Sequence, residues 1–267
     1  MNETFQAAMC YVILSRIMCL EQLMLTKFDP SKIYCNEKAK QEAKRLKEIA
    51  INNKSSKWQV KTKDILKVSI LNIRSFKKHV QDLKNDHVLQ ESDVISLSET
   101  WLDADLEMNF GKFSCCFLNR GVQGLALLSV EKPNHVSFGQ GEASVMLTSF
   151  VQFDLISIYK PHNITDTVQF TESVTKMLNF NRTILISGDV NIDILQEPNN
   201  IFTATLIRLG FKQLVKTATH EKGGLLDHVY FFSPYQFVIC EICKVYSVYY
   251  SDHDAITLFL DFSKIED

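Results

Sequence analysis

Short apolar runs rich in Val, Ile and Phe recur from residue 65 onward, separated by Asp, Asn, Gly and Pro. Runs of this length and composition, bounded by turn-forming residues, are typical of β-strands with a buried face. The predicted strands are Ile65–Ile73, Val94–Leu97, Leu125–Val130, Ser144–Phe150, Leu155–Tyr159, Thr183–Ser187, Val229–Phe232 and Ala255–Phe262. The fourth and fifth are close enough in sequence to form a hairpin.

Helical periodicity falls between some of these strands, at Ser75–Asn85, Thr165–Phe180 and Ile201–Leu209. Thr165 or Asp166 can cap the second helix, and Gly210 is a typical residue after the end of the third. Strands and helices do not alternate strictly. The predicted fold class is therefore α/β, with packed mixed sheets flanked by helices rather than a doubly wound parallel sheet.

The N-terminal region has a different pattern of apolar and charged residues. An apolar stretch at 9–25 is followed by a turn and by a charged segment at 36–50 that is rich in helix-forming Lys, Glu and Ala. We divide the chain into an N-terminal helical fragment at 1–58, a linker at 59–65 and a main domain at 66–262. The apolar stretch is too short and too interrupted by polar residues to span a bilayer, and no basic segment precedes it. We therefore expect an intracellular protein without membrane contact.

Charge and cysteine content add little specificity. The net charge is −2, but 37–67 carries ten basic and four acidic residues. Such a segment is usually a solvated helix face or linker, and less often a nucleic-acid contact. Seven cysteines without regular spacing indicate reduced thiols. Cys240 and Cys243 form a lone CxxC without a second ligand pair, which favours packed thiols over a zinc site.

Polar residues recur where the predicted strands end, and side chains at one edge of a sheet can meet in a cleft. The candidates are Asn72, Glu99, Tyr159, Asp189, Asn191, Asp227, Asp252 and His253. Each alone has an ordinary structural explanation, such as a turn, a cap or a packed aromatic ring. Their repetition at strand ends is harder to explain structurally, and we expect Asp189 and His253 to line a solvent-accessible cleft.

Together these groups suit phosphodiester hydrolysis, which requires charge neutralisation at phosphorus, an activated water and a stabilised leaving oxygen. Glu99 and Asp252 are suitable carboxylate ligands for Mg²⁺. Asp189 can orient or deprotonate the attacking water, with Asn191 positioning it. His253 can stabilise the transferring phosphoryl group if Asp227 fixes its tautomer.

The ordered series of motifs closely resembles the endonuclease/exonuclease/phosphatase superfamily over about 200 residues. The motifs are Leu-Asn-Ile-Arg-Ser (71–75), Asp-Val-Ile-Ser-Leu-Ser-Glu-Thr-Trp-Leu (93–102), Ile-Tyr-Lys-Pro (158–161), Gly-Asp-Val-Asn-Ile-Asp (188–193), Leu-Asp-His-Val-Tyr (226–230) and Ser-Asp-His-Asp-Ala-Ile (251–256). The resemblance implies a four-layered α/β sandwich with two central sheets and a site at their top edge.

The resemblance also assigns roles, with Mg²⁺ or Mn²⁺ as the cofactor. Glu99 matches the main metal-binding glutamate, with Asn72 beside it and Asp252 as the last metal-side carboxylate. Tyr159 matches a phosphate-contacting tyrosine, and Asp189 and Asn191 match the pair that handles the water. Asp227 and His253 match the carboxylate–histidine dyad. Val190 departs from the usual Phe or Leu, and Arg120–Gly124 has fewer glycines than related domains.

Two features resemble proteins of transposable elements. Glu-Thr-Trp-Leu (99–102) is similar to their endonuclease domains. Residues 11–16, 20–21, 28–30 and 33 resemble the C-terminal end of superfamily 1 helicases of Helitron elements, in which the arginine at the position of Arg16 reaches the nucleotide. The chain lacks a Gly-x-x-x-x-Gly-Lys-Ser/Thr loop, so no nucleotide is expected. We prefer the alternative that Arg16 lies on an isolated helical piece.

The sequence thus predicts a Mg²⁺-dependent DNA endonuclease of transposable-element origin that acts in the nucleus. Two alternatives stay open. The same fold and residues also serve phosphatases of small phosphate esters such as inositol phosphates, because a fold does not select a substrate. The second alternative is that the chain is an inactive relic that binds DNA without cutting it. No oligomeric state is predicted.

Overall fold

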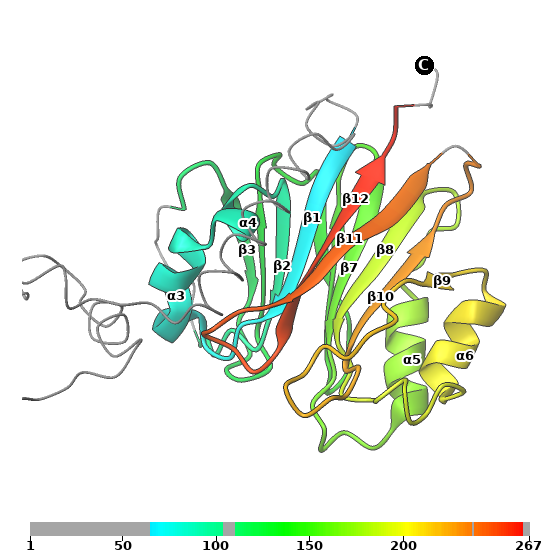
Figure 1. Ribbon diagram of the computed structural model, residues 1–267. Helices are drawn as coiled ribbons and strands as arrows, with labels where there is room; N and C mark the ends of the chain where they lie inside the picture. The colour runs from blue at the N-terminus through cyan, green and yellow to red at the C-terminus, as the bar shows by residue number, and fades with distance from the viewer. Residues whose placement is uncertain (1–64, 104–109, 237, 264–267) are drawn as a thin grey trace, which may run out of the picture. The chain divides into compact units, whose positions relative to one another are not determined.

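The computed structural model describes residues 65–103, 110–236 and 238–263 (Figure 1). The chain divides into two compact units, 1–61 and 62–267, and the described residues belong to the second. The predicted helicase-like fragment at 1–58, with Arg16, and the basic segment up to residue 64 lie outside the described residues. Within the described ranges, no helix is both long and apolar enough to cross a membrane.

Two six-stranded mixed sheets form the centre of this unit. In order across the first sheet, the strands are β11 (Ile239–Ser247), β12 (Asp254–Asp261), β1 (Ile65–Asn72), β2 (Val94–Ser98), β4 (Leu125–Ser129) and β3 (Ser114–Leu118). In the second they are β5 (His135–Phe138), β6 (Ser144–Ser149), β7 (Phe153–Tyr159), β8 (Thr183–Asp189), β10 (Asp227–Phe232) and β9 (Lys212–Gln213). The pairs β1–β2 and β7–β8 are parallel, and the other neighbours are antiparallel.

Helices cover the outer faces of the two sheets, with α3 and α4 on one side and α5 and α6 on the other (Figure 1). They span Phe76–Asn85 (α3), His87–Gln90 (α4), Thr167–Thr175 (α5) and Ile201–Arg208 (α6). Side chains cap each of them: Ser75, Asp86, Asp166 and Asn200 accept from backbone amides of the first turn. The three predicted helices are confirmed, with Asp166 as the cap of α5 and Gly210 at φ +92° just beyond α6.

Alternation along the strands divides the core into three layers. On β1, Val68 and Ile70 pack into the cluster between the two sheets, whereas Leu71 packs under α3. A third cluster, which includes Phe170 and Phe202, lies between the second sheet and α5 and α6. The result is helix, sheet, sheet, helix, so the predicted four-layered α/β sandwich is confirmed.

Four strands were not predicted, namely β3, β5, β9 and β11. All four are the edge strands of the two sheets. No residue of β3 or β5 is fully buried, so these two strands lack the continuous buried run that identifies a central strand. In β5, for example, His135 and Phe138 are exposed. The predicted hairpin of β6 and β7 is confirmed.

Strand register brings the predicted polar residues to one edge of the sandwich. Asn72 pairs with Ser98 at the ends of the parallel strands β1 and β2. Tyr159 pairs with Asp189 at the ends of β7 and β8, and Asp189 pairs with Asp227 at the start of β10.

Cys115 and Cys116 on β3 are thiols outside any disulfide. Burial is the main cause that raises the pKa of Cys115 and Cys116 above the ordinary thiol value. These two thiols are therefore partly buried.

Candidate active site

Asn72 connects residues from both sheets. Its amide nitrogen donates to Glu99 Oε1 at 3.0 Å and to Asp189 Oδ2 at 2.9 Å, and lies 3.4 Å from His253 Nε2. The amide oxygen instead accepts from the backbone N–H of Arg74 at 3.2 Å. In this arrangement Asn72 presents a donor rather than a ligand oxygen to the carboxylates. Its role as a metal ligand stays a prediction.

Glu99 lies just beyond the end of β2, and its carboxylate is held from several sides. Oε1 also accepts from the Tyr159 hydroxyl at 3.0 Å, and Oε2 accepts from Trp101 Nε1 at 3.3 Å. Burial and the nearby carboxylates raise the pKa of Tyr159, so this residue acts as a neutral donor. Glu99 and Trp101 both have positive φ, at 51° and 56°. Such conformations in non-glycine residues cluster at functional sites.

Asp189 is fully buried at the end of β8. Asn191 donates its backbone N–H to Asp189 Oδ1 at 2.9 Å and its side-chain amide to Oδ2 at 3.2 Å. Burial, followed by the charge of Asp227, raises the pKa of Asp189 to about 7, although His253 opposes the shift. The expected position on the wall of an open cleft is wrong for Asp189, because the amides of Asn72 and Asn191 cover its carboxylate.

The dyad of Asp227 and His253 is formed. His253 Nδ1 donates to Asp227 Oδ2 at 2.8 Å, and Nε2 lies 3.9 Å from Asp189 Oδ2. Both residues are buried, at 1% and 5% exposure. Burial alone lowers the pKa of His253, but Asp227 and then Asp189 outweigh it and raise the pKa to about 9. His253 is therefore an imidazolium at neutral pH, with Nε2 facing the centre of the cluster.

Asp252 precedes β12 and forms an ion pair with the Arg74 guanidinium. Arg74 Nε also lies 4.0 Å from Glu99 Oε2, so one cation lies beside both carboxylates. Asp252 Oδ1 is buried and has no hydrogen-bond partner among the described residues. Its side chain and that of Glu99 are 17% and 12% exposed, whereas Arg74 is 47% exposed. The cluster therefore opens toward solvent on the Arg74 side.

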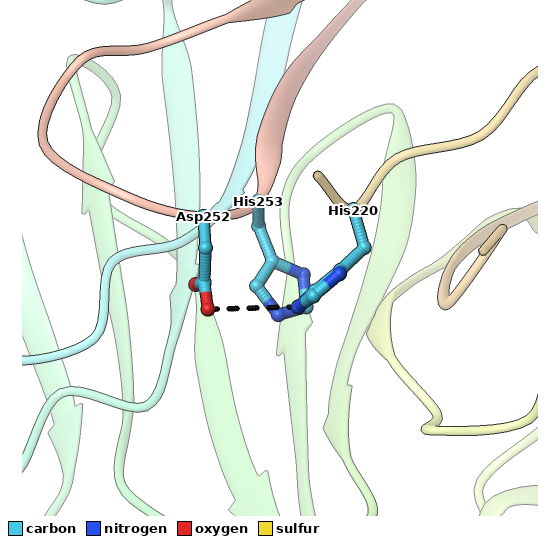
Figure 2. Close-up of side chains that lie close together, drawn as sticks. All are labelled: His220, Asp252 and His253. Carbon is cyan, nitrogen blue, oxygen red and sulfur yellow. Dashed lines mark ion pairs between the residues drawn. The ribbon is translucent and has the colours of Figure 1, made fainter. Parts of the chain in front are cut away.

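His220 was missed by the sequence analysis and lies beside the dyad (Figure 2). Its ring meets that of His253 edge to face, with centroids 4.7 Å apart and planes at 89°. His220 Nε2 lies 3.5 Å from Asp252 Oδ2. Arg74 could have been found from the sequence, because it lies two residues after Asn72 in the motif at 71–75. His220 had no comparable signal, because 33 residues separate it from His253.

The donor set fits a hard divalent cation beside Glu99 and Asp252. Carboxylate oxygens are the ligands that Mg²⁺ and Mn²⁺ prefer, and the unpartnered Oδ1 of Asp252 leaves a ligand position free. Two sets of three potential ligand atoms lie within 4.8 Å of one another, namely His220, Asp252 and His253, and Asp189, Asp227 and His253. The second set is closed by the bond between Asp227 and His253, and we favour the pair of Glu99 and Asp252 because both are carboxylates and both are partly exposed.

An open groove of about 490 Å³ adjoins this edge of the cluster. Its lining combines cations and aromatic rings with the carboxylate of Asp252. The residues are Arg74, Lys78, His79, Trp101, Glu221, Tyr249, Tyr250, Ser251 and Asp252. Trp101 and Tyr249 are 42% and 83% exposed.

The two departures from the family pattern have structural consequences that do not touch the cluster. Val190 is fully buried in the cluster of apolar side chains beneath α5 and α6. Arg120 donates to the backbone oxygens of Gly141 and Ala143 at 3.0 and 3.1 Å, which joins the loop between β3 and β4 to the loop between β5 and β6.

No protein-family model and no curated protein matches this sequence, but solved structures match its fold. An AP endonuclease from Archaeoglobus fulgidus is 17% identical, with a TM-score of 0.57 over 74% of this chain and 99% of its own. A 3′ phosphatase from Neisseria, bound to a product DNA hairpin, is 17% identical, with a TM-score of 0.52 over 72% and 98%. An endonuclease/exonuclease/phosphatase from Beutenbergia cavernae is 13% identical, with a TM-score of 0.53 over 74% and 72%. The chain therefore has the endonuclease/exonuclease/phosphatase fold.

Proposed function

We propose that residues 66–262 form a metal-dependent phosphodiesterase that hydrolyses the DNA backbone. The observation that carries the proposal is the single hydrogen-bonded network across the two sheets. In it, Asn72 joins Glu99 to Asp189, and Asp227 holds His253 beside them. Groups suited to binding a cation, accepting a proton and stabilising a phosphoryl group therefore lie within one small volume.

Asp189 is the proposed proton acceptor, and the Asn72 amide that covers its carboxylate would have to turn away for the water to reach it. Its pKa of about 7 suits proton transfer near neutral pH, where a base must be largely deprotonated and still basic. As the water oxygen bonds to phosphorus, its proton passes to Asp189, and the bond from phosphorus to the leaving oxygen breaks, with the leaving oxygen taking the electron pair and a proton from solvent. Asn191 positions the water through its amide oxygen, because its amide nitrogen already donates to Asp189 Oδ2 and to the backbone oxygen of Lys160, which fixes the side chain.

His253 is the proposed donor to the phosphoryl oxygens. The contact from Nδ1 to Asp227 fixes the orientation of the ring and directs Nε2–H toward the centre of the cluster. A buried imidazolium there stabilises the negative charge that gathers on the phosphoryl group. The Tyr159 hydroxyl, now bonded to Glu99, is a further neutral donor within the same cluster.

Glu99 and Asp252 would hold the cation, with Asn72 completing the set if its amide turns. Bound Mg²⁺ or Mn²⁺ would neutralise charge on the phosphoryl oxygens. Arg74 now pairs with both carboxylates and would then be free to contact a phosphate, which guanidinium groups bind well.

The groove favours DNA over a small phosphate ester. It extends the cluster with Lys78, Arg74 and the exposed rings of Trp101 and Tyr249. Cations that track phosphates and rings that stack on bases are the usual components of a polynucleotide site. The AP endonuclease and the 3′ phosphatase with its DNA hairpin share the fold, which agrees with a DNA substrate. The motif at 99–102 supports a transposable-element origin and, with it, a nuclear setting.

A substrate panel tests this proposal. Purified chain with Mg²⁺ is given supercoiled plasmid, an inositol phosphate and a small phosphodiester, with Asp189→Ala as the matched control. We expect nicked plasmid from the parent and none from the variant, with inositol phosphate intact. Hydrolysis of the inositol phosphate with intact plasmid would make the protein a phosphatase. A folded, metal-binding parent that turns over none of the substrates would be an inactive relic.

A further inference from the structure

We propose that His220 is a second catalytic imidazole, which donates a hydrogen bond from Nε2 to the phosphoryl group under attack. This inference rests on the proposed function of the site. It starts from the convergence of His220, Asp252 and His253, whose ligand atoms lie within 4.8 Å of one another (Figure 2). His220 and His253 come from different segments, which a β-bridge between the two residues joins.

Local hydrogen bonding fixes the tautomer of His220. Its Nδ1 lies 3.1 Å from the backbone N–H of Lys222 and can only accept from it. A neutral imidazole with an accepting Nδ1 carries its proton on Nε2. The contact with the backbone therefore makes the other ring nitrogen, Nε2, an N–H donor.

The Nε2–H group of His220 makes no hydrogen bond of normal length to a carboxylate of the described residues. Its nearest carboxylate contact, Asp252 Oδ2, is 3.5 Å away, longer than the usual range of about 2.7–3.2 Å. Asp252 Oδ2 is already paired with Arg74. The His220 side chain is 12% exposed, so the ring is mostly but not wholly enclosed. A phosphoryl oxygen seated on His253 Nε2 would lie close to His220 Nε2–H.

The backbone also holds the ring in place. Glu221 N donates to Asp252 O at 2.9 Å, and Asp254 N donates to Thr219 O at 2.7 Å, so the segments on both sides of the two histidines are tied together. Thr219 Oγ1 in turn accepts from the N–H of Asp227 at 3.0 Å. The segment that carries His220 thus positions both members of the dyad as well.

The tautomer argues against a metal ion on the same three residues. A metal at Nε2 requires that nitrogen without its proton, which moves the proton of a neutral ring to Nδ1. Nδ1–H would then face the N–H of Lys222, donor against donor. The geometry favours a hydrogen bond to an anion over coordination of a cation at His220.

Two substitutions separate a catalytic donor from a packing role. His220→Phe keeps a ring that can meet His253 edge to face but removes the donor. His220→Gln ends in an amide N–H at a similar reach. In single-turnover nicking of plasmid we expect His220→Phe to slow cleavage about 100-fold, the usual loss for one oxyanion donor. We expect His220→Gln to retain cleavage within about tenfold of the parent. The control His135→Gln, on the exposed edge strand β5, should cleave like the parent.

Equal rates for parent and His220→Phe would overturn the proposal, as would equal losses in the Phe and Gln variants with unchanged thermal stability. NMR of ¹⁵N-labelled parent gives a readout that needs neither cleavage nor the folding of a variant. We expect the Nε2–H tautomer for His220, and a shift of its Nε2–H resonance when inorganic phosphate is added without metal. An Nδ1–H tautomer, or a phosphate response of His253 alone, would refute the role of His220. If the parent does not cleave DNA but its His220 resonance responds to phosphate, the proposed reaction is wrong and the phosphate contact of His220 stands.

Discussion

Replacing Asp227 with asparagine removes the carboxylate that holds His253 as an imidazolium. The contact from His253 Nδ1 to Asp227 Oδ2 is 2.8 Å, both groups are buried, and Asp227 is the main cause that raises the pKa of His253 to about 9. Loss of an adjacent opposite charge lowers a histidine pKa by about 2 units, or about 3 kcal/mol. At pH 8 most of the imidazolium would then be lost, and the asparagine amide can also turn to favour the wrong tautomer.

We therefore expect Asp227→Asn to lower the single-turnover cleavage rate at pH 8 by at least about tenfold, because a His253 pKa that falls from about 9 to about 7 leaves only about a tenth of the rings protonated at that pH. The same pKa shift also determines how the free energy of unfolding depends on pH. The folded pKa of His253 lies above its ordinary value of 6.5, so the dyad stabilises the parent fully below pH 6.5 and loses that contribution as the pH rises through about 9. Urea unfolding between pH 6 and 9 should show this loss in the parent and much less of it in the variant.

The control for this experiment is Asp261→Asn at the far end of β12, which removes the same charge away from the cluster. NMR titration of the His253 ring reports the pKa directly. A His253 pKa still near 9 in Asp227→Asn, or a cleavage rate within threefold of the parent, would refute the reasoning.

Two further predictions concern the framework. Gly188→Ala would place a Cβ 1.9 Å from the Ile158 carbonyl oxygen at φ +144°, so we expect a loss of about 3 kcal/mol or more in urea unfolding. A midpoint equal to the parent's would contradict this. Burial lowers the pKa of His228 to about 4, so the parent should lose about 3 kcal/mol as the pH falls from 6.5 to 4. In the same assay, His228→Gln should not show this loss of unfolding free energy at low pH. If the variant loses as much as the parent between pH 6.5 and 4, other groups cause the loss.

The central strands could be predicted from the sequence because burial on both faces demands long apolar runs, as in β7 and β8, whose residues are all buried. The edge strands could not, because β9 has two residues and β5 only four. The convergence of Asn72, Asp189 and Asp227 followed from the rule that strand ends share an edge. The complete burial of Asp189 could not be predicted in this way, because it depends on the neighbouring amides that cover the carboxylate.

Side chains supplied by loops were harder to predict. His220 meets His253 only through a β-bridge between segments 33 residues apart, and no periodicity in the sequence encodes that pairing. Arg74 could be seen in its motif, but its two carboxylate partners are 25 and 178 residues away. Such contacts depend on the tertiary fold rather than on local pattern.

The most direct test of the central claim is nicking of supercoiled plasmid by the purified chain with Mg²⁺, with EDTA in its place, and with the isosteric variant Glu99→Gln. The account predicts relaxed plasmid from the parent with Mg²⁺, none with EDTA, and a loss of at least about 100-fold for Glu99→Gln. Nicking that persists in EDTA, or a Glu99→Gln variant that cuts as fast as the parent, would contradict a metal-dependent site built around Glu99.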